Sequence, residues 1–134
     1  MEEIKYKRLE LSDIENIIIE YNKEDLEKFI ENKDNYLFAG IKDNKAIAFL
    51  YGYGMLRPDG RRMFYIHSVD VLPEYQSKGI PAIIVNHLAR ICRENGIKIC
   101  ETGPELEKNE AVQGLWKGFE TRQHRRRRCW KKDI

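Results

Sequence analysis

The sequence predicts an α+β fold, in which a mixed sheet, antiparallel in its first part and parallel in its last, is flanked by helices. Residues 4–9, 36–41 and 45–55 are rich in β-branched and aromatic residues, and a short turn joins the last two segments. Residues 63–72 and 97–101 have the same character, but an amphipathic helical segment separates them. A helical crossover joins parallel strands, so the sheet changes direction at this point.

Two helices are expected between the first and second strands. Residues 12–15 (Ser-Asp-Ile-Glu) have the pattern of a capping box. The apolar residues that follow at helical spacing are Ile14, Ile17, Ile18 and Tyr21. A second helix is expected over 24–31, with Leu26, Phe29 and Ile30 on its buried side.

Turn and helix-end signals mark the rest of the sheet. Asp43 and Asn44 suit a tight hairpin turn, and residues 58–60 (Pro-Asp-Gly) suit the next turn. Pro81 suits the first turn of the crossover helix, where its missing N–H breaks no helical bond. Residues 95–96 (Asn-Gly) end that helix. Its buried stripe is expected to be Ile84, Leu88, Ile91 and Cys92.

The last part of the chain predicts one more helix and one more strand. Asn109 is expected to cap the helix, and the strand is expected at roughly 122–131. The apolar face of that helix would consist of Val112, Leu115, Trp116 and Phe119. No repeat or low-complexity linker interrupts the sequence, so a single domain over residues 1–134 is expected.

Composition favours a cytoplasmic protein. The chain is 42% hydrophobic and 34% charged, with a formal net charge of +2, which fits one domain with a modest core. It has no apolar run near the ~20 residues that span a bilayer, and its N-terminus lacks the pattern of a secretory signal. The three cysteines form no C-x-x-C pair and the three histidines are dispersed, so neither a disulfide nor a metal site is expected.

The most informative segment is 69–81. A β-rich run stops at Pro73, passes through a polar loop that holds Gly79, and opens into an apolar helix. A strand, a glycine loop and a helix N-terminus in this order form an anion site, because free backbone N–H groups and the helix dipole both point at the loop.

This spacing resembles the acetyl-CoA loop of the GNAT superfamily of N-acetyltransferases, Gln/Arg-x-x-Gly-x-Gly/Ala after a strand that ends Val-x-Pro-x-Tyr. The residues in register are Val71, Pro73, Tyr75, Gln76 and Gly79. The resemblance implies the acyl-CoA N-acyltransferase (GNAT) fold, with acetyl-CoA as cosubstrate. The cofactor-binding residues that it implies are Val69, Asp70 and Val71 along the pantetheine arm, and Gln76, Ser77, Lys78, Gly79, Ile80 and Pro81 at the pyrophosphate. Pro81 stands where the family has Gly or Ala, which removes one N–H donor and adds a ring.

A second family signature, Asn-x-x-Ala-x-x-Leu-Tyr before Gly-Phe, resembles the segment from Asn109 to Phe119. The resemblance places Asn109 near the pantetheine and Trp116 near the sulfur, where the family has a tyrosine credited with protonating the thiolate. An indole N–H donates a hydrogen bond but is too weak an acid to deliver a proton. Core packing on its helix is the structural alternative for Trp116.

The resemblance predicts an enzyme that transfers an acetyl group from acetyl-CoA to a primary amine of an unidentified small molecule or peptide. Residues 36–91 look most like small bacterial acetyltransferases of the aminoglycoside 3-N-acetyl type. One alternative is a degenerate member that binds CoA weakly or acts through protein contacts, which Pro81 and Trp116 both favour. The sequence does not decide whether the protein forms a homodimer, and no membrane partner is expected.

Charge is unevenly distributed along the chain. Residues 1–34 hold eleven acids against six bases, and residues 117–134 hold eight bases against two acids. The basic end fits a solvated or partner-facing edge, or a site for an acidic substrate or the adenosine 3′-phosphate. A nucleic-acid module is disfavoured, because the basic run is short and holds one aromatic residue, Trp130. Arginines at 125–128 would repel a polycationic aminoglycoside if they lined its pocket.

The amine acceptor must lose a proton near the gap between the two parallel strands. Glu101, at the end of the second of these, is the first candidate for the catalytic base, followed by His67 and Asp70. Strand alternation is expected to put His67 on one face of the sheet and Ser68 with Asp70 on the other. A solvated strand end for Glu101, and a hydrogen-bonded turn or bulge for Asp70, are the structural alternatives.

Overall fold

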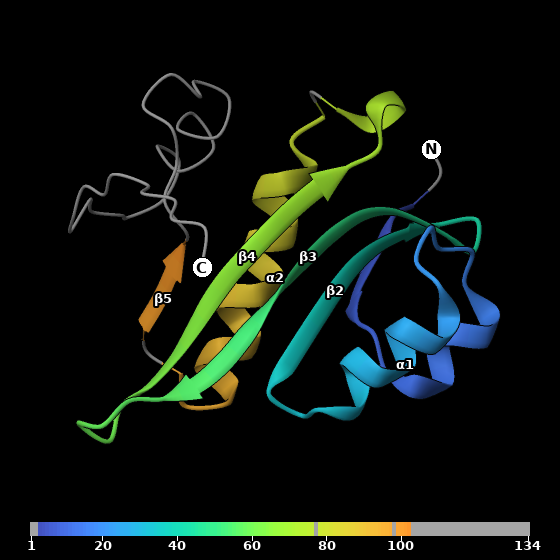
Figure 1. Cartoon of the computed structure of the whole chain (residues 1–134). Helices are drawn as coiled ribbons and strands as arrows, with labels where there is room; N and C mark the ends of the chain where they lie inside the picture. Colours follow the sequence, from blue (N-terminus) through green and yellow to red (C-terminus); the bar gives the residue numbers. More distant parts are fainter. Residues whose placement is uncertain (1–2, 77, 98, 103–134) are drawn as a thin grey trace, which may run out of the picture. The chain divides into compact units, whose positions relative to one another are not determined.

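A computed structural model describes residues 3–76, 78–97 and 99–102, all of which belong to one compact unit, Met1–Thr102. The elements in this part of the chain (Figure 1), with η for a 3-10 helix, are β1 (Lys5–Arg8), η1 (Leu11–Asn16), α1 (Lys23–Glu31), β2 (Asn35–Lys42), β3 (Lys45–Leu56), β4 (Arg62–Val71), η2 (Pro73–Tyr75), α2 (Ile80–Glu94) and β5 (Ile99–Thr102). The strands form one sheet in the order β1-β2-β3-β4-β5. All neighbours are antiparallel except β4 and β5, which are parallel. The predicted α+β class with a mixed sheet is confirmed.

Helices cover both faces of the sheet, α1 on one side and α2 on the other (Figure 1). On the α1 face, the buried cluster consists of Leu9, Ile14, Leu26, Leu37, Ala39, Ala46 and Phe49. On the α2 face, the buried residues of the helix are Ile80, Ile84, Val85, Leu88 and Cys92. Phe38 lies between Leu37 and Ala39 and is 1% exposed, so alternate residues of β2 are buried on opposite faces. The predicted stripe of α2 is confirmed except for Ile91, which is half-buried.

The first predicted α-helix is wrong. Residues 11–16 form a short 3-10 helix, and the reciprocal cap joins Glu10 and Asp13 rather than Ser12 and Glu15. The helix cannot continue because Ile18 pairs with the start of β3: its N–H donates to the Asn44 carbonyl at 2.8 Å, and its carbonyl accepts from Ala46 at 2.9 Å.

This pairing changes which side chains reach the core. Ile14 is 2% exposed, whereas Ile18 is 65% exposed and Tyr21 is 41% exposed. The segment before α1 is therefore extended and holds Tyr21 beside the sheet instead of within a helical stripe. The second predicted helix is confirmed as α1, with Asn22 as its N-cap accepting from the Glu24 and Asp25 N–H groups.

The predicted turns are confirmed by their backbone angles. Asp43 and Asn44 have φ of 51° and 61°, as the mirror-image turn of a two-residue hairpin requires. Gly60 has φ of 85° in the next hairpin, and Gly96 has φ of 72° after the end of α2. Both hairpins keep the strands in a register that brings Val71, at the end of β4, opposite Ala48 in the first part of β3.

A bulge interrupts the pairing of β3 with β4 at His67. Tyr51 lies opposite Ser68 and Gly52 lies opposite Ile66, so β4 has one residue more than β3 at this point. The close approach requires glycine on β3, since a Cβ at Gly52 would lie 2.1 Å from the Tyr65 carbonyl oxygen. The bulge changes the face of the sheet on which the residues of β4 after His67 lie.

Within the described ranges, no helix is long and apolar enough to cross a membrane. Helix and strand predictions beyond Thr102, including those at Asn109 and Trp116, lie outside the described residues, as does Ser77.

Candidate active site

Gly79 forms the bend between β4 and α2. Its φ of 72° lies in the left-handed region, and it is the N-cap of the 15-residue helix α2. A Cβ added to Gly79 would meet no atom within 4 Å, so the inner side of this bend is open. Neither the Gly79 nor the Ile80 N–H donates to another described residue. Two such donors at a helix N-terminus fit the diphosphate of a nucleotide cofactor.

Gln76 has a different part in this loop from the one its motif implies. Its backbone N–H donates to the Pro73 carbonyl at 3.3 Å and closes the turn of η2. Its side-chain Nε2 donates to the Val71 carbonyl, also at 3.3 Å. Gln76 therefore ties the loop to the end of β4, and the N–H groups left to a ligand come from the residues after it.

Pro81 occupies the second position of α2, directly after Ile80. It has no N–H, so the first turn offers one donor fewer than a helix of ordinary sequence. Its ring is half-buried. The helix starts normally in spite of this, because proline is tolerated in a first turn.

Two lysines place positive charge beside the loop. The Nζ atoms of Lys42 and Lys78 lie 5.3 and 5.5 Å from the centroid of the Tyr75 ring. Lys78 follows from the loop motif, but Lys42 lies at the end of β2 and gives no local signal in the sequence. Its position makes the loop more attractive to phosphate groups.

β5 pairs with the first half of β4. The register runs from Met63 opposite Ile99 to Ile66 opposite Thr102, while β4 continues to Val71 (Figure 1). In the described part of the chain, residues 68–71 pair with β3 alone.

The prediction that His67 lies on the opposite face from Ser68 and Asp70 is wrong. The bulge adds a residue to β4, so strict alternation fails there. Ser68 lies opposite Tyr51 in the register, and the His67 ring stacks on that same Tyr51 ring at 5.0 Å. Ser68 Oγ donates to Asp70 Oδ2 at 2.7 Å, which joins the two side chains.

Glu101 also belongs to this face. It lies opposite Tyr65 in the parallel register, and residues directly opposite each other in a sheet share a face. Tyr65 is in edge contact with His67, with ring centroids 6.3 Å apart. The three predicted catalytic residues, His67, Asp70 and Glu101, thus lie on the α1 face of adjoining strands. Strict alternation along the sequence would put Asp70 on the opposite face of the sheet from His67.

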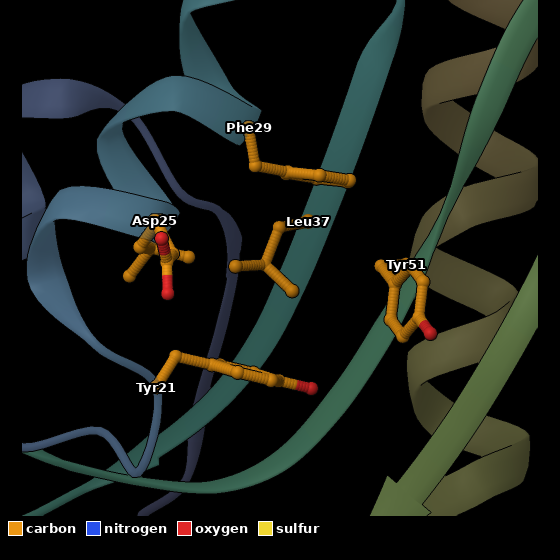
Figure 2. Close-up of a pocket in the computed structure, with 6 residues that line it drawn as sticks. Tyr21, Asp25, Phe29, Leu37 and Tyr51 are labelled. Atoms are coloured by element: carbon orange, nitrogen blue, oxygen red, sulfur yellow. The ribbon is translucent and has the colours of Figure 1, made fainter.

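Two cavities open on the α1 face. The first, which we call the apolar cavity, has a volume of about 200 Å³ and lies between α1 and the β2–β3 pair. Figure 2 shows the Tyr21 and Phe29 rings reaching across it from the α1 side, with Leu37 between them, Tyr51 opposite, and Asp25 near α1. The lining residues are Tyr21, Asp25, Leu26, Phe29, Leu37 and Tyr51.

The second, which we call the β4 cavity, has a volume of about 420 Å³ and lies at the end of β4. Its lining includes Glu20, Tyr21, Asp70 and Val71. Tyr21 lines both cavities, so they adjoin. Sequence reasoning assigned Tyr21 to a helical stripe and missed both cavities, because they are built between segments far apart in the chain.

Carboxylates line both cavities: Glu20 and Asp70 the β4 cavity, and Asp25 the apolar cavity. The pKa of Tyr21 is raised by partial burial and by the charges of Asp70, Tyr51 and Glu20. The pKa of Tyr51 is raised by burial, then by Tyr53 and Asp70. Both phenols stay neutral past their usual pKa, first because they are partly buried and then because of the nearby Asp70 charge, which also attracts cations. Among the described residues, no group of three or more His, Cys, Asp or Glu side chains is placed to hold a metal ion.

A family model of the acetyltransferase (GNAT) family matches residues 6–120. The chain belongs to this family, and the family resemblance found in the glycine loop is confirmed. Members are acetyltransferases that use acetyl-CoA. No curated protein sequence matches the chain.

Solved structures of the same fold agree. An aminoglycoside acetyltransferase from an uncultured soil metagenomic sample, in complex with trehalose, has a TM-score of 0.82 at 16% identity, covering 98% of this chain and 96% of that one. Aminoglycoside N-acetyltransferase AAC(6′)-Iy in complex with CoA has a TM-score of 0.79 at 12% identity, covering 100% and 97%. Ribosomal-protein-alanine N-acetyltransferase from Brucella melitensis biovar Abortus 2308 has a TM-score of 0.76 at 13% identity, covering 98% and 100%. These likenesses confirm the GNAT fold.

Proposed function

We propose that this chain is a single-domain cytoplasmic N-acetyltransferase that transfers an acetyl group from acetyl-CoA to the primary amine of a small molecule or peptide. The observation that carries the proposal is the geometry at the end of β4. β4 pairs in parallel with β5 along its first half, and the chain then turns at the left-handed Gly79 into the N-terminus of α2. A face with three proton acceptors borders the same strand.

The glycine loop would hold acetyl-CoA through its diphosphate. The N–H groups of Gly79 and Ile80 would donate to it, and Lys42 and Lys78 would add positive charge. The backbone of Val69 to Val71 would bind the pantetheine arm as a strand-like partner. When bound, acetyl-CoA supplies a thioester: the amine nitrogen forms a C–N bond as the C–S bond breaks, the nitrogen loses a proton, and the thiolate gains one.

The residues of the α1 face would bind the amine and accept its proton. Asp70 lines the β4 cavity, and Ser68 donates to its carboxylate, so Asp70 is placed to hold an ammonium group. The ammonium group must lose one proton before its nitrogen can attack, and Glu101 remains our first candidate for the base that takes it, with His67 as the second. We also keep Asn109 near the pantetheine and Trp116 near the sulfur as proposals from the family signature. Because an indole cannot deliver the proton, water would supply it to the thiolate.

A second candidate function is a degenerate member that binds CoA weakly or acts through protein contacts. One observation favours it, namely that Pro81 removes a donor from the first turn of α2. Losing one charge-assisted hydrogen bond costs about 1.5–3 kcal/mol, or one to two decades of affinity. Such a loss weakens binding without abolishing it, so we place the active enzyme first.

The test combines binding with turnover. Isothermal titration with acetyl-CoA is expected to show saturable binding, and thiol release with a panel of primary amines is expected to show turnover. Glu101→Gln should lower kcat by about a hundredfold or more with unchanged acetyl-CoA affinity. Glu94→Gln, at the end of α2, is the control and should leave both unchanged. Binding without turnover of any amine favours the degenerate member, and no binding to the folded protein at millimolar ligand rejects the enzyme and leaves a member that acts through protein contacts.

A further inference from the structure

The two adjoining cavities of the α1 face differ in chemistry. The β4 cavity brings carboxylates to the end of β4, with Glu20 and Asp70 in its lining. The apolar cavity next to it is lined by rings and branched aliphatic side chains, with Asp25 as its single carboxylate. A substrate that filled both would carry a cation at one end and hydrocarbon at the other.

We propose that the acceptor is a primary amine attached to a compact apolar group, whose ammonium nitrogen lies beside Asp70 and whose hydrocarbon part fills the apolar cavity. This inference rests on the proposed function, because it names the substrate class of the same site.

Size limits the hydrocarbon part. The apolar cavity has a volume of about 200 Å³. An apolar cavity of ~150 Å³ in another protein takes up benzene. The cavity therefore has room for a six-membered ring or an alkyl chain of about six to eight carbons.

The walls of the cavity favour hydrocarbon over polar groups. Leu26 and Leu37 are 5% and 3% exposed and offer no hydrogen bond. The Tyr21 and Phe29 rings extend across the space on either side of Leu37 (Figure 2). A polyhydroxylated sugar ring in this position would leave hydroxyl groups without partners, which costs free energy. The lining thus selects against an aminoglycoside ring in the apolar cavity.

The negative charge of the cavity linings favours a substrate with a cationic end. No lysine, arginine or histidine lines either cavity among the described residues, whereas Glu20, Asp25 and Asp70 do. Burial is the main cause of the raised pKa values of Tyr21 and Tyr51, and the Asp70 charge raises both further. Tyr21 lines both cavities, so a chain that starts beside Asp70 enters the apolar cavity along this ring.

A chain-length series tests the size and the chemistry together. Calorimetry of the full-length protein with n-alkylamines from propylamine to decylamine is expected to show affinity rising about fourfold per methylene, as each is buried. The rise should stop at about eight carbons, when the cavity is full. 1-Hexanol, which lacks the charge, should bind at least about tenfold more weakly than hexylamine. A flat series, or equal binding of the alcohol, overturns the inference.

A variant of the shared wall locates the binding. Tyr21→Ala should weaken the binding of hexylamine by about tenfold and that of propylamine by less than about twofold, since only the longer chain reaches the apolar cavity. Tyr21 is 41% exposed, so the variant is expected to fold. Ile18→Ala, 65% exposed in the same extended segment and outside both cavities, is the matched control. Equal losses for both amines in Tyr21→Ala contradict the placement of the chain.

The same measurements separate this inference from the proposed function. If acetyl-CoA is turned over with kanamycin and not with hexylamine, the enzyme stands and the substrate class is wrong. If the chain-length dependence and the Tyr21 effect appear but acetyl-CoA neither binds nor reacts, the cavity assignment stands and the proposed function fails.

Discussion

The imidazole ring of His67 stacks on the phenol ring of Tyr51, with ring centroids 5.0 Å apart and planes 18° from parallel. Tyr53 and Tyr65 meet the same imidazole edge-on. The bulge re-aims the residues of β4 that follow His67, so Asp70 lies on the same face as His67. One extra residue in one strand thus puts Asp70 on the face that carries His67 and, on β5, Glu101.

Replacing His67 separates its aromatic role from a catalytic one. His67→Phe keeps a ring against Tyr51, so we expect the free energy of unfolding to change by less than about 0.5 kcal/mol. His67→Ala loses the stack and should cost about 1 kcal/mol. With Glu101 as the base, kcat for His67→Phe should stay within about threefold of the parent. A fall of about a hundredfold in that variant would move the base to His67.

Gly52 is the residue of β3 that the bulge most constrains. A Cβ there would lie 2.1 Å from the Tyr65 carbonyl oxygen and 2.8 Å from the Phe64 ring. Because relieving this clash requires a shift of the backbone, Gly52→Ala should lower the free energy of unfolding by about 3 kcal/mol or more. Gly54→Ala is the control: its Cβ would meet the Tyr36 ring at 3.2 Å, which costs about 1 kcal/mol. Urea unfolding measures both, and equal losses would contradict the close approach at Gly52.

Replacing Pro81 is expected to raise the affinity for CoA. Pro81→Ala restores an N–H at the second position of α2, directly after Ile80. If this N–H faces the diphosphate, CoA affinity should rise by about ten- to a hundredfold. Pro58→Ala, in the β3–β4 hairpin, controls for the general effect of losing a proline. Unchanged affinity in Pro81→Ala would mean that the first turn of α2 does not meet phosphate.

The buried thiol of Cys92 predicts a pH dependence of stability. Burial raises its pKa from the ordinary value of 9.0 to about 11. The unfolded chain therefore releases this proton first, and the contribution to stability is lost as pH rises from about 9 to about 11. The free energy of unfolding should fall more over this range in the parent than in Cys92→Ala. Parallel pH profiles for the two proteins would show that the thiol is not buried in the folded state.

Much of the fold could be predicted because its signals are local. The Asp43–Asn44 turn, the end of α2 at Gly96 and the alternation along β2 depend on neighbouring residues. The helix expected after Ser12 failed because a distant strand decided the outcome, through the pairing of Ile18 with Lys45.

The site was less predictable, since it depends on contacts between distant segments. The loop and Gly79 could be identified from a motif. The bulge at His67 depends on Gly52 in the neighbouring strand, and Lys42 reaches Tyr75 only in the folded sheet. The apolar cavity needs Tyr21 outside a helix, a consequence of the same pairing that overturned the first helix.

A comparison of the two glycines that flank α2 tests the central claim most directly. Gly79 and Gly96 both have φ of 72° and open space where a Cβ would lie, but they stand at opposite ends of the helix. Alanine at either should cost a similar ~1–2 kcal/mol of backbone strain. Calorimetry with CoA should show an affinity loss of about tenfold or more for Gly79→Ala and no change for Gly96→Ala, because only Gly79 borders the proposed diphosphate site. Equal CoA affinity in the two folded variants would contradict the claim that this loop binds the cofactor.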